Sequence, residues 1–143
     1  MQTTISRTHD PARASTFFED KLAFTTGPVE LDHMIKANET IVVVDVREAA
    51  DFAKGHVPGA LNLPQDKWDS LGGMTRDRTY IFYCYTQTCH LAARACARFA
   101  TQGYPVMEME GGFAAWKAAE LDIELEPVNR LRKASERLLH RRH

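Results

Sequence analysis

The chain has 143 residues, of which 44% are hydrophobic and 26% are charged, and its formal net charge is −1. This is the length of one domain and the composition of an ordinary globular protein. Its apolar runs fall short of the roughly 18 residues that a membrane span needs, and residues 1–11 lack the apolar segment of a signal peptide. We therefore expect a cytoplasmic protein without a membrane partner, in which three clustered cysteines do not form a disulfide framework.

The first predicted element is a helix over residues 12–24. Asp10 is a favourable N-cap and Pro11 suits the first helical position. The hydrophobic residues of this segment recur at helical spacing, which indicates an amphipathic helix. A second helix is expected over residues 28–37, with an inner side made of Leu31, Met34 and Ile35.

Strands and helices are predicted to alternate between residues 40 and 120. The apolar run 40–46 has the continuous pattern of a strand buried on both faces. Further strands are expected at 60–63, 80–83 and 105–109, and helical segments at 47–54, 66–71, 90–102 and from 112 to Leu121. This order predicts an α/β fold with a largely parallel central sheet and helices on both faces. Ligands of such sheets bind beyond the carboxyl ends of the strands.

Cys84 directly follows the strand predicted at 80–83 and precedes the helix predicted at 90–102. Unpaired N–H groups and the dipole at a helix N-terminus favour a thiolate, which is the nucleophilic form of cysteine. The alternative is that Cys84 is a small buried hydrophobic residue, the commoner role of an isolated cysteine inside cells. The strand–loop–helix context favours a functional cysteine.

Several blocks of the sequence form a pattern along the chain: Asp45-Val46-Arg47, Gly55 to Pro64, Tyr83-Cys84, Gly103 to Val106 and Glu110 to Trp116. In order and spacing these blocks resemble the rhodanese-like sulfurtransferase domain family. The resemblance covers about residues 28–122. It divides the chain into an N-terminal helical extension (1–27), a rhodanese-like domain (28–122) and a basic C-terminal helix (123–143).

The resemblance implies a double displacement at Cys84. Its thiolate would take the sulfane sulfur of a donor such as thiosulfate, hold it as a persulfide and pass it to a thiol or cyanide. The backbone N–H groups of the following loop would surround the persulfide and stabilise its charge. The substrate-binding residues would then be Tyr85, Thr86, Gln87, Thr88, Cys89 and His90, with no metal or organic cofactor.

The loop departs from the family pattern. Family loops commonly contain a glycine and often end with a basic residue, whereas the only potential cation here is His90. Without glycine a left-handed position is more costly, and without arginine an anionic donor is held less firmly. Thr86, Gln87 and Thr88 could donate hydrogen bonds instead. The departure weakens the case for thiosulfate more than the case for persulfide chemistry.

These residues allow four other interpretations. Phosphatases of the same fold use a Cys-x5-Arg loop, but here Cys84-x5 ends at His90. Cys84 and Cys89 could form a redox pair in which Cys89 resolves a sulfenate or persulfide on Cys84 as a disulfide, unless Cys89 is only a first-turn helix residue. A zinc site formed by Cys84, Cys89, His90 and Cys96 is disfavoured, because Cys89 and His90 are adjacent and point apart on a helix. The fourth interpretation is a non-catalytic module that binds partners.

Charges are distributed unevenly along the chain. Residues 127–143 hold six Lys or Arg and one Glu, so this segment carries +5 and the remainder −6. Such a tail could bind nucleic acid, but no aromatic residue interleaves its charges, so we expect a solvated helix face and no nucleic-acid partner. The two amphipathic end helices are candidates for a homodimer interface.

Overall fold

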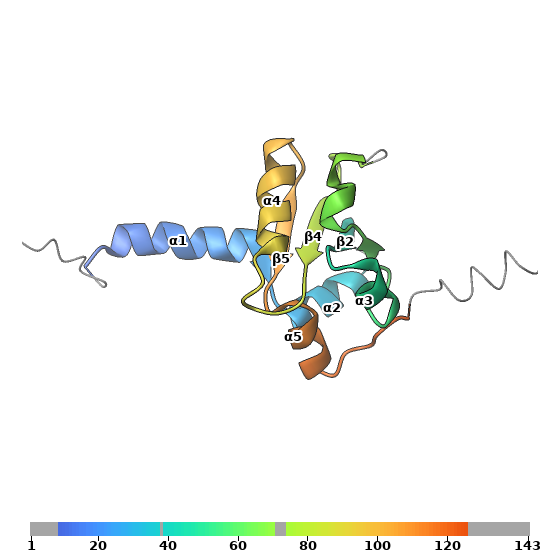
Figure 1. Ribbon diagram of the computed structural model, residues 1–143. Coiled ribbons are helices and arrows are strands. Elements are labelled where there is room, and N and C mark those ends of the chain that lie inside the picture. Colours follow the sequence, from blue (N-terminus) through green and yellow to red (C-terminus); the bar gives the residue numbers. More distant parts are fainter. Residues whose placement is uncertain (1–8, 38, 71–73, 126–143) are drawn as a thin grey trace, which may run out of the picture.

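The computed structural model describes residues 9–37, 39–70 and 74–125, and within them it contains a five-stranded parallel sheet (Figure 1). The strands follow the order β1-β5-β4-β2-β3. Their bounds are β1 Thr25–Thr26, β2 Ile41–Asp45, β3 Leu61–Asn62, β4 Thr79–Tyr83 and β5 Val106–Met109. The helices are α1 Pro11–Phe24, α2 Pro28–Lys36, α3 Ala49–Ala53, the 3₁₀ helix η1 Gln65–Ser70, α4 Leu91–Thr101 and α5 Gly112–Ala118. The predicted α/β fold is confirmed.

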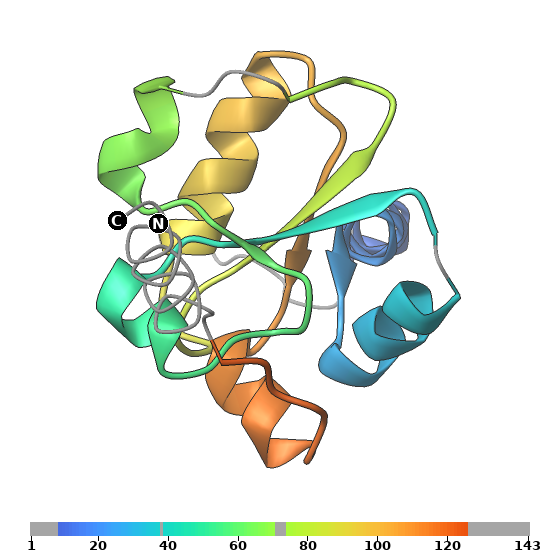
Figure 2. The same ribbon diagram turned by 90° about the vertical axis from the view of Figure 1, so that its right-hand side faces the viewer.

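Two hydrophobic cores lie on opposite faces of the sheet, because side chains of a strand alternate between faces. Ile81 and Tyr83 of β4 pack with residues of α2, α3 and α5, including the fully buried Trp116. Tyr80 and Phe82 pack on the other face with α4 and η1. Helices therefore cover both faces, as Figure 2 shows, and this explains why β2 and β4 are apolar almost throughout.

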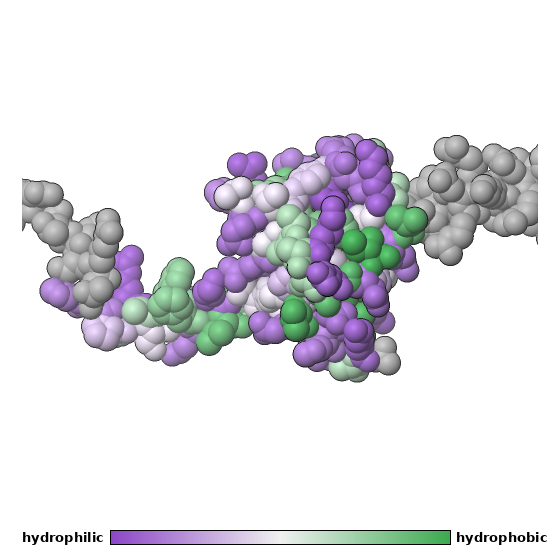
Figure 3. Space-filling model, turned by 90° about the horizontal axis from the view of Figure 1, so that it is seen from below, coloured by the Kyte–Doolittle hydropathy of each residue, from purple (hydrophilic) through white to green (hydrophobic). Residues whose placement is uncertain are grey.

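Helix α1 begins at the predicted cap and projects from the body of the molecule (Figure 1). The Asp10 carboxylate accepts a hydrogen bond from the Arg13 N–H at 3.0 Å. No residue of α1 is buried, and its large apolar side chains Phe17, Phe18, Leu22 and Phe24 are 55–79% exposed. Figure 3 shows this hydrophobic surface on the projecting helix. A homodimer through the end helices stays a prediction.

The structure differs from the sequence-based expectations mainly at the ends of elements. Strand β1 was not predicted, because two residues are too few for a periodic pattern; it pairs with Glu108 and Met109 of β5. Helix α5 ends at Ala118, so Leu121 lies beyond it. The basic C-terminal helix predicted at 123–143 lies outside the described residues from 126 onward, and the proposed division into three segments stays a prediction. Within the described part of the chain, no helix is long and apolar enough to cross a membrane.

A buried ion pair between Asp45 and Arg47 lies at the carboxyl end of β2. Arg47 donates to Asp45 through Nη2 at 2.7 Å and Nε at 3.0 Å, and Nη2 also donates to the carbonyl of Gly55 at 2.7 Å. The Tyr83 hydroxyl donates to the same carboxylate at 2.5 Å. His56 is equally buried, with Nδ1 2.8 Å from the carbonyl oxygen of Phe52. These contacts give Asp45, Arg47 and His56 a structural role.

Candidate active site

Cys84 lies at the carboxyl end of β4, on the face of the sheet that α4 covers. It continues the alternation of Tyr80 and Phe82, and it packs in the same core. Its side chain is only 2% exposed. The strand therefore fixes the direction of the sulfur, which faces the beginning of α4 rather than solvent. This is the end of the sheet at which the topology predicts a ligand site.

The loop from Cys84 to His90 closes without a left-handed residue. The Cys89 N–H donates to the Thr86 carbonyl at 3.2 Å, which makes a tight turn. None of residues 84–90 has a positive φ. The absence of glycine from this loop consequently imposes no backbone strain. Its exposed members are Thr86, Gln87, Thr88 and His90, whereas Tyr85 and Cys89 are half-buried.

The first residues of α5 form backbone hydrogen bonds with this loop. The N–H groups of Phe113 and Ala114 donate to the carbonyls of Cys84 at 2.8 Å and Tyr85 at 3.0 Å. Gly112 makes this approach possible: a Cβ there would lie 2.6 Å from the backbone nitrogen of Thr86. The sequence showed Gly111-Gly112 only as part of the resemblance; the glycine pair before a helix was the available signal of close backbone contact.

Two backbone N–H groups approach the Cys84 sulfur, those of Tyr85 and Ala92. Tyr85 belongs to the predicted cradle, but Ala92, in the first turn of α4, was not predicted. The side chain of Tyr85 has another role. Its hydroxyl donates to Asp51 at 2.6 Å and accepts from the Glu48 N–H at 3.2 Å, so the ring anchors the loop to α3.

Comparison with known proteins identifies the family. The family model described as "Rhodanese-like domain" matches residues 27–119. The chain belongs to the rhodanese-like domain family. This match and the buried cysteine at the end of β4 agree with the resemblance seen in the sequence.

The relatives of this rhodanese-like chain include a protein named as a sulfurtransferase and one named as a transcriptional regulator. It is 33% identical to the thiosulfate sulfurtransferase GlpE of Pseudomonas putida, over 64% of this chain and 83% of the relative. It is 32% identical to an HTH-type transcriptional regulator of Mycobacterium tuberculosis, where the match covers 59% of this chain but only 38% of the regulator. The solved structure of the BH2092 protein of Bacillus halodurans superposes with a TM-score of 0.75 at 32% identity, covering 80% of this chain and 86% of that protein.

The environment of the cysteine in this rhodanese-like domain changes the expected charge state. Burial, followed by a hydrogen bond with the Cys89 thiol, raises the pKa of Cys84 to about 11, and the N–H groups of Ala92 and Tyr85 oppose this only in part. The sequence analysis expected the helix N-terminus to favour the thiolate. That expectation is wrong in direction for the resting Cys84, because the cost of burying a charge exceeds the effect of two amides.

The pKa of Cys89 is shifted in the opposite direction, below its ordinary value. Burial alone would raise its pKa, but the hydrogen bond from Cys84 and the N–H groups of Leu91 and Tyr85 outweigh burial and hold it below the ordinary value. Glu108 acts against them by repulsion. Cys96, within α4, has its pKa raised to about 12 by burial, with Glu108 adding to the effect. The three thiols should therefore differ in reactivity.

We expect iodoacetamide at neutral pH to alkylate Cys89 at least about tenfold faster than Cys84 or Cys96, because the thiolate is the reacting form. As the pH rises toward 11, labelling of Cys84 should accelerate while that of Cys89 levels off. Peptide mass spectrometry of quenched time points measures each site separately. Faster labelling of Cys84 than of Cys89 at neutral pH would contradict this assignment of charge.

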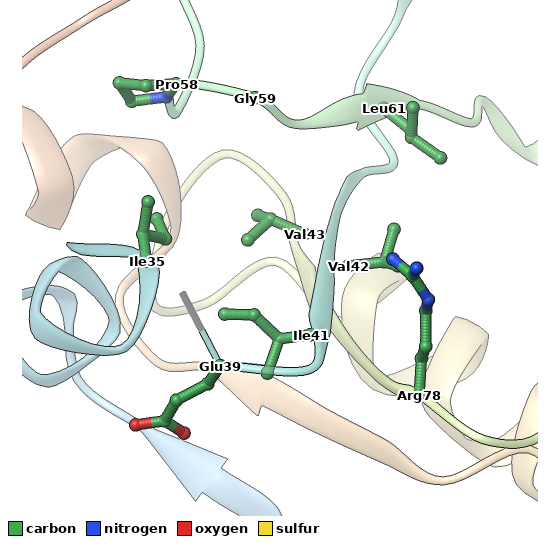
Figure 4. Close-up of a pocket in the computed structure, with 9 residues that line it drawn as sticks. All are labelled: Ile35, Glu39, Ile41, Val42, Val43, Pro58, Gly59, Leu61 and Arg78. Carbon is green, nitrogen blue, oxygen red and sulfur yellow. The ribbon is translucent and has the colours of Figure 1, made fainter. Parts of the chain in front are cut away.

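No group of three potential metal ligands occurs in the described part of the chain. A pocket of about 420 Å³ lies elsewhere, beside the first residues of β2 and between α2 and β3 (Figure 4). Val42, Ile35 and Leu61 contribute to its lining, with Glu39 and Arg78 as charged members. Because Cys84 lies at the carboxyl end of the sheet, this pocket at the amino end of β2 is not part of the candidate site.

Proposed function

We propose that this rhodanese-like chain is a sulfurtransferase that carries sulfane sulfur as a persulfide on Cys84. The observation that supports this most is the position of the Cys84 sulfur, at the carboxyl end of β4 and facing the N–H groups of Tyr85 and Ala92. Amides that point at one sulfur stabilise negative charge on a second sulfur bound to it. Relatives named sulfurtransferase are consistent with the proposal.

The reaction has two half-steps. The Cys84 thiolate attacks the outer sulfur of thiosulfate, sulfite leaves, and the enzyme holds Cys84–S–S⁻. With an alkyl persulfide as donor, the leaving group is the alkyl thiol. A thiol or cyanide then removes the outer sulfur and regenerates Cys84. Because the resting thiol is protonated at neutral pH, loss of its proton precedes or accompanies the first attack.

The exposed side chains of the loop are proposed to bind the donor. Thr86, Gln87, Thr88 and His90 lie at the solvent side of the turn. The Oγ1 atoms of Thr86 and Thr88 are 3.3 Å apart, so both hydroxyls can donate hydrogen bonds to the same anion. Hydrogen bonds would replace the missing basic side chain, although they hold an anion less firmly than arginine does. A cytoplasmic location belongs to the same proposal, since a sulfur-carrying cysteine needs thiols that stay reduced.

A redox-active thiol protein is the second candidate, and the contact of the Cys84 thiol with the Cys89 carbonyl oxygen at 3.4 Å favours it, because it places the two cysteines side by side. In that function an oxidant would convert Cys84 to a sulfenate, which Cys89 would close to a disulfide. A rhodanese-fold module that only binds partners is the third candidate. It differs from the other two in that neither cysteine would change covalently.

The test is intact-protein mass spectrometry after anaerobic incubation with thiosulfate or an alkyl persulfide, followed by alkylation. We expect sulfite or alkyl thiol to be released in step with sulfur uptake by the protein, and we expect Cys84→Ser to release neither. Cyanide that is present together with the donor should take the outer sulfur and yield thiocyanate. If no donor gives a leaving product, the chain is not a sulfur carrier, and disulfide formation with peroxide would then separate the redox protein from the binding module.

A further inference from the structure

Cys89 occupies the same amide-lined site as Cys84. Its N–H closes the turn with Thr86, and its own carbonyl oxygen is 3.4 Å from the Cys84 sulfur. The Tyr85 N–H approaches both sulfurs, while Leu91 and Ala92, neighbours in the first turn of α4, approach one each. The Cys84 thiol donates a hydrogen bond to that Cys89 carbonyl oxygen. The residue in contact with the Cys84 sulfur thus carries a second sulfur nucleophile.

Cys89 also lies closer to solvent than Cys84. Cys84 is buried, whereas Cys89 is half-buried at the edge of the same core. An external thiol therefore meets the loop at Cys89 before it reaches the inner sulfur of Cys84. Cys96 provides a contrast: it is half-buried on α4 too, but its thiol is hydrogen-bonded to the Met107 carbonyl at 3.4 Å, away from the loop.

We propose that Cys89 is a second catalytic residue, which resolves the persulfide on Cys84 and releases its sulfur as hydrosulfide. This inference rests on the proposed persulfide function. Cys89 attacks the inner sulfur, the Sγ of Cys84, and a Cys84–Cys89 disulfide forms as the persulfide S–S bond breaks. The outer sulfur leaves with that electron pair and takes the Cys89 proton. The balance is Cys84–S–S⁻ plus Cys89–SH giving the disulfide plus HS⁻.

The oxidising equivalents of this step come from the sulfane sulfur, so no external oxidant is needed. The outer sulfur is reduced to sulfide while the two cysteines are oxidised. A dithiol reductant then opens the disulfide by thiol–disulfide exchange and restores both thiols for another cycle. Attack on Cys84 Sγ is favoured because Cys89 already contacts this atom, and because exchange rates depend on access to the attacked sulfur.

The experiment compares the wild-type chain with Cys89→Ser and the matched variant Cys96→Ser. Each full chain is reduced, freed of reductant and mixed anaerobically with one equivalent of thiosulfate or an alkyl persulfide. Sulfite or alkyl thiol, free sulfide and remaining thiols are measured over time. Alkylated protein is analysed by intact mass and by disulfide mapping of the peptide that contains residues 84 and 89.

We expect wild type and Cys96→Ser to release the donor's leaving product first and then sulfide, with loss of two free thiols and a mapped Cys84–Cys89 disulfide. Cys89→Ser should release the leaving product, retain one extra sulfur on Cys84 and give at least about tenfold less sulfide. The donor-free sample should form no disulfide, which excludes adventitious oxidation.

A wild-type chain that keeps the added sulfur as well as Cys89→Ser does, without sulfide, would overturn the inference and leave the proposed function intact. Release of sulfide by Cys89→Ser at the wild-type rate would also overturn it. Absence of a leaving product in all three chains would be a different failure, because it removes the persulfide on which the step depends.

Discussion

Gly112→Ala is expected to lower the rate of sulfur uptake by about 100-fold, the scale of effect when reacting groups are misplaced by about 1 Å. The added Cβ would lie 2.6 Å from the Thr86 nitrogen and from the Tyr85 carbonyl carbon, and 2.8 Å from the Cys84 carbonyl oxygen. All three are backbone atoms that cannot rotate away. The loop must therefore move away from α5. This movement displaces the Cys84 sulfur from the backbone N–H groups that approach it.

The same substitution is expected to destabilise the fold. Gly112 has φ +63°, and a side chain in the left-handed region costs roughly 1–2 kcal/mol. Overpacking against a fixed backbone adds about 1–3 kcal/mol. Urea denaturation measures the sum, and uptake should be assayed well below the midpoint so that only folded protein is compared.

Gly59→Ala is the matched control for this prediction. Gly59 has a similar φ of +79°, but a Cβ at this position would meet nothing within 4 Å. This variant should incur the conformational cost of roughly 1–2 kcal/mol and take up sulfur at the wild-type rate. If Gly112→Ala behaves like Gly59→Ala in both measurements, close packing of α5 against the loop does not position Cys84.

Arg47→Met is expected to lower the free energy of unfolding by about 3–5 kcal/mol, the range for removing one partner of a buried ion pair. Asp45 is fully buried and Arg47 is 4% exposed. Methionine replaces much of the apolar stem but none of the four side-chain hydrogen bonds, at 2.7–3.1 Å, that Arg47 donates to Asp45 and Gly55. The carboxylate would be left buried, with the Tyr83 hydroxyl and the backbone N–H of residue 47 as its donors.

Two further variants separate the buried charge from other causes. Asp45→Asn combined with Arg47→Met should be less destabilised than Arg47→Met alone, because the unpaired charge is gone. Lys21→Met breaks the solvent-exposed pair with Glu110 and should change stability little. Equal midpoints and slopes in urea for Arg47→Met and Lys21→Met would show that the buried pair has no special role.

Elements whose signals lie close together in the chain could be predicted from the sequence. The Asp10 cap, the apolar run of β2 and the strand that ends at Tyr83 depend on residues close together in the chain, and they were predicted with errors of one or two residues. Strand β1 was missed, because its two residues are defined by their pairing with β5. The cost expected for a left-handed position in a loop without glycine does not arise, since residues 84–90 avoid the left-handed region.

Three features can be inferred from the amino-acid sequence alone: the alternation of strands and helices, the family resemblance and the place of Cys84 at the end of a strand. These follow from periodicity and local motifs, which act over a few residues. The fold is needed to show that Ala92 and Cys89 lie beside Cys84, that Gly112 allows α5 to pack against the loop, and that burial raises the pKa of the Cys84 thiol. The reason is that burial and backbone contact depend on segments far apart in the chain, which the fold brings together around one sulfur.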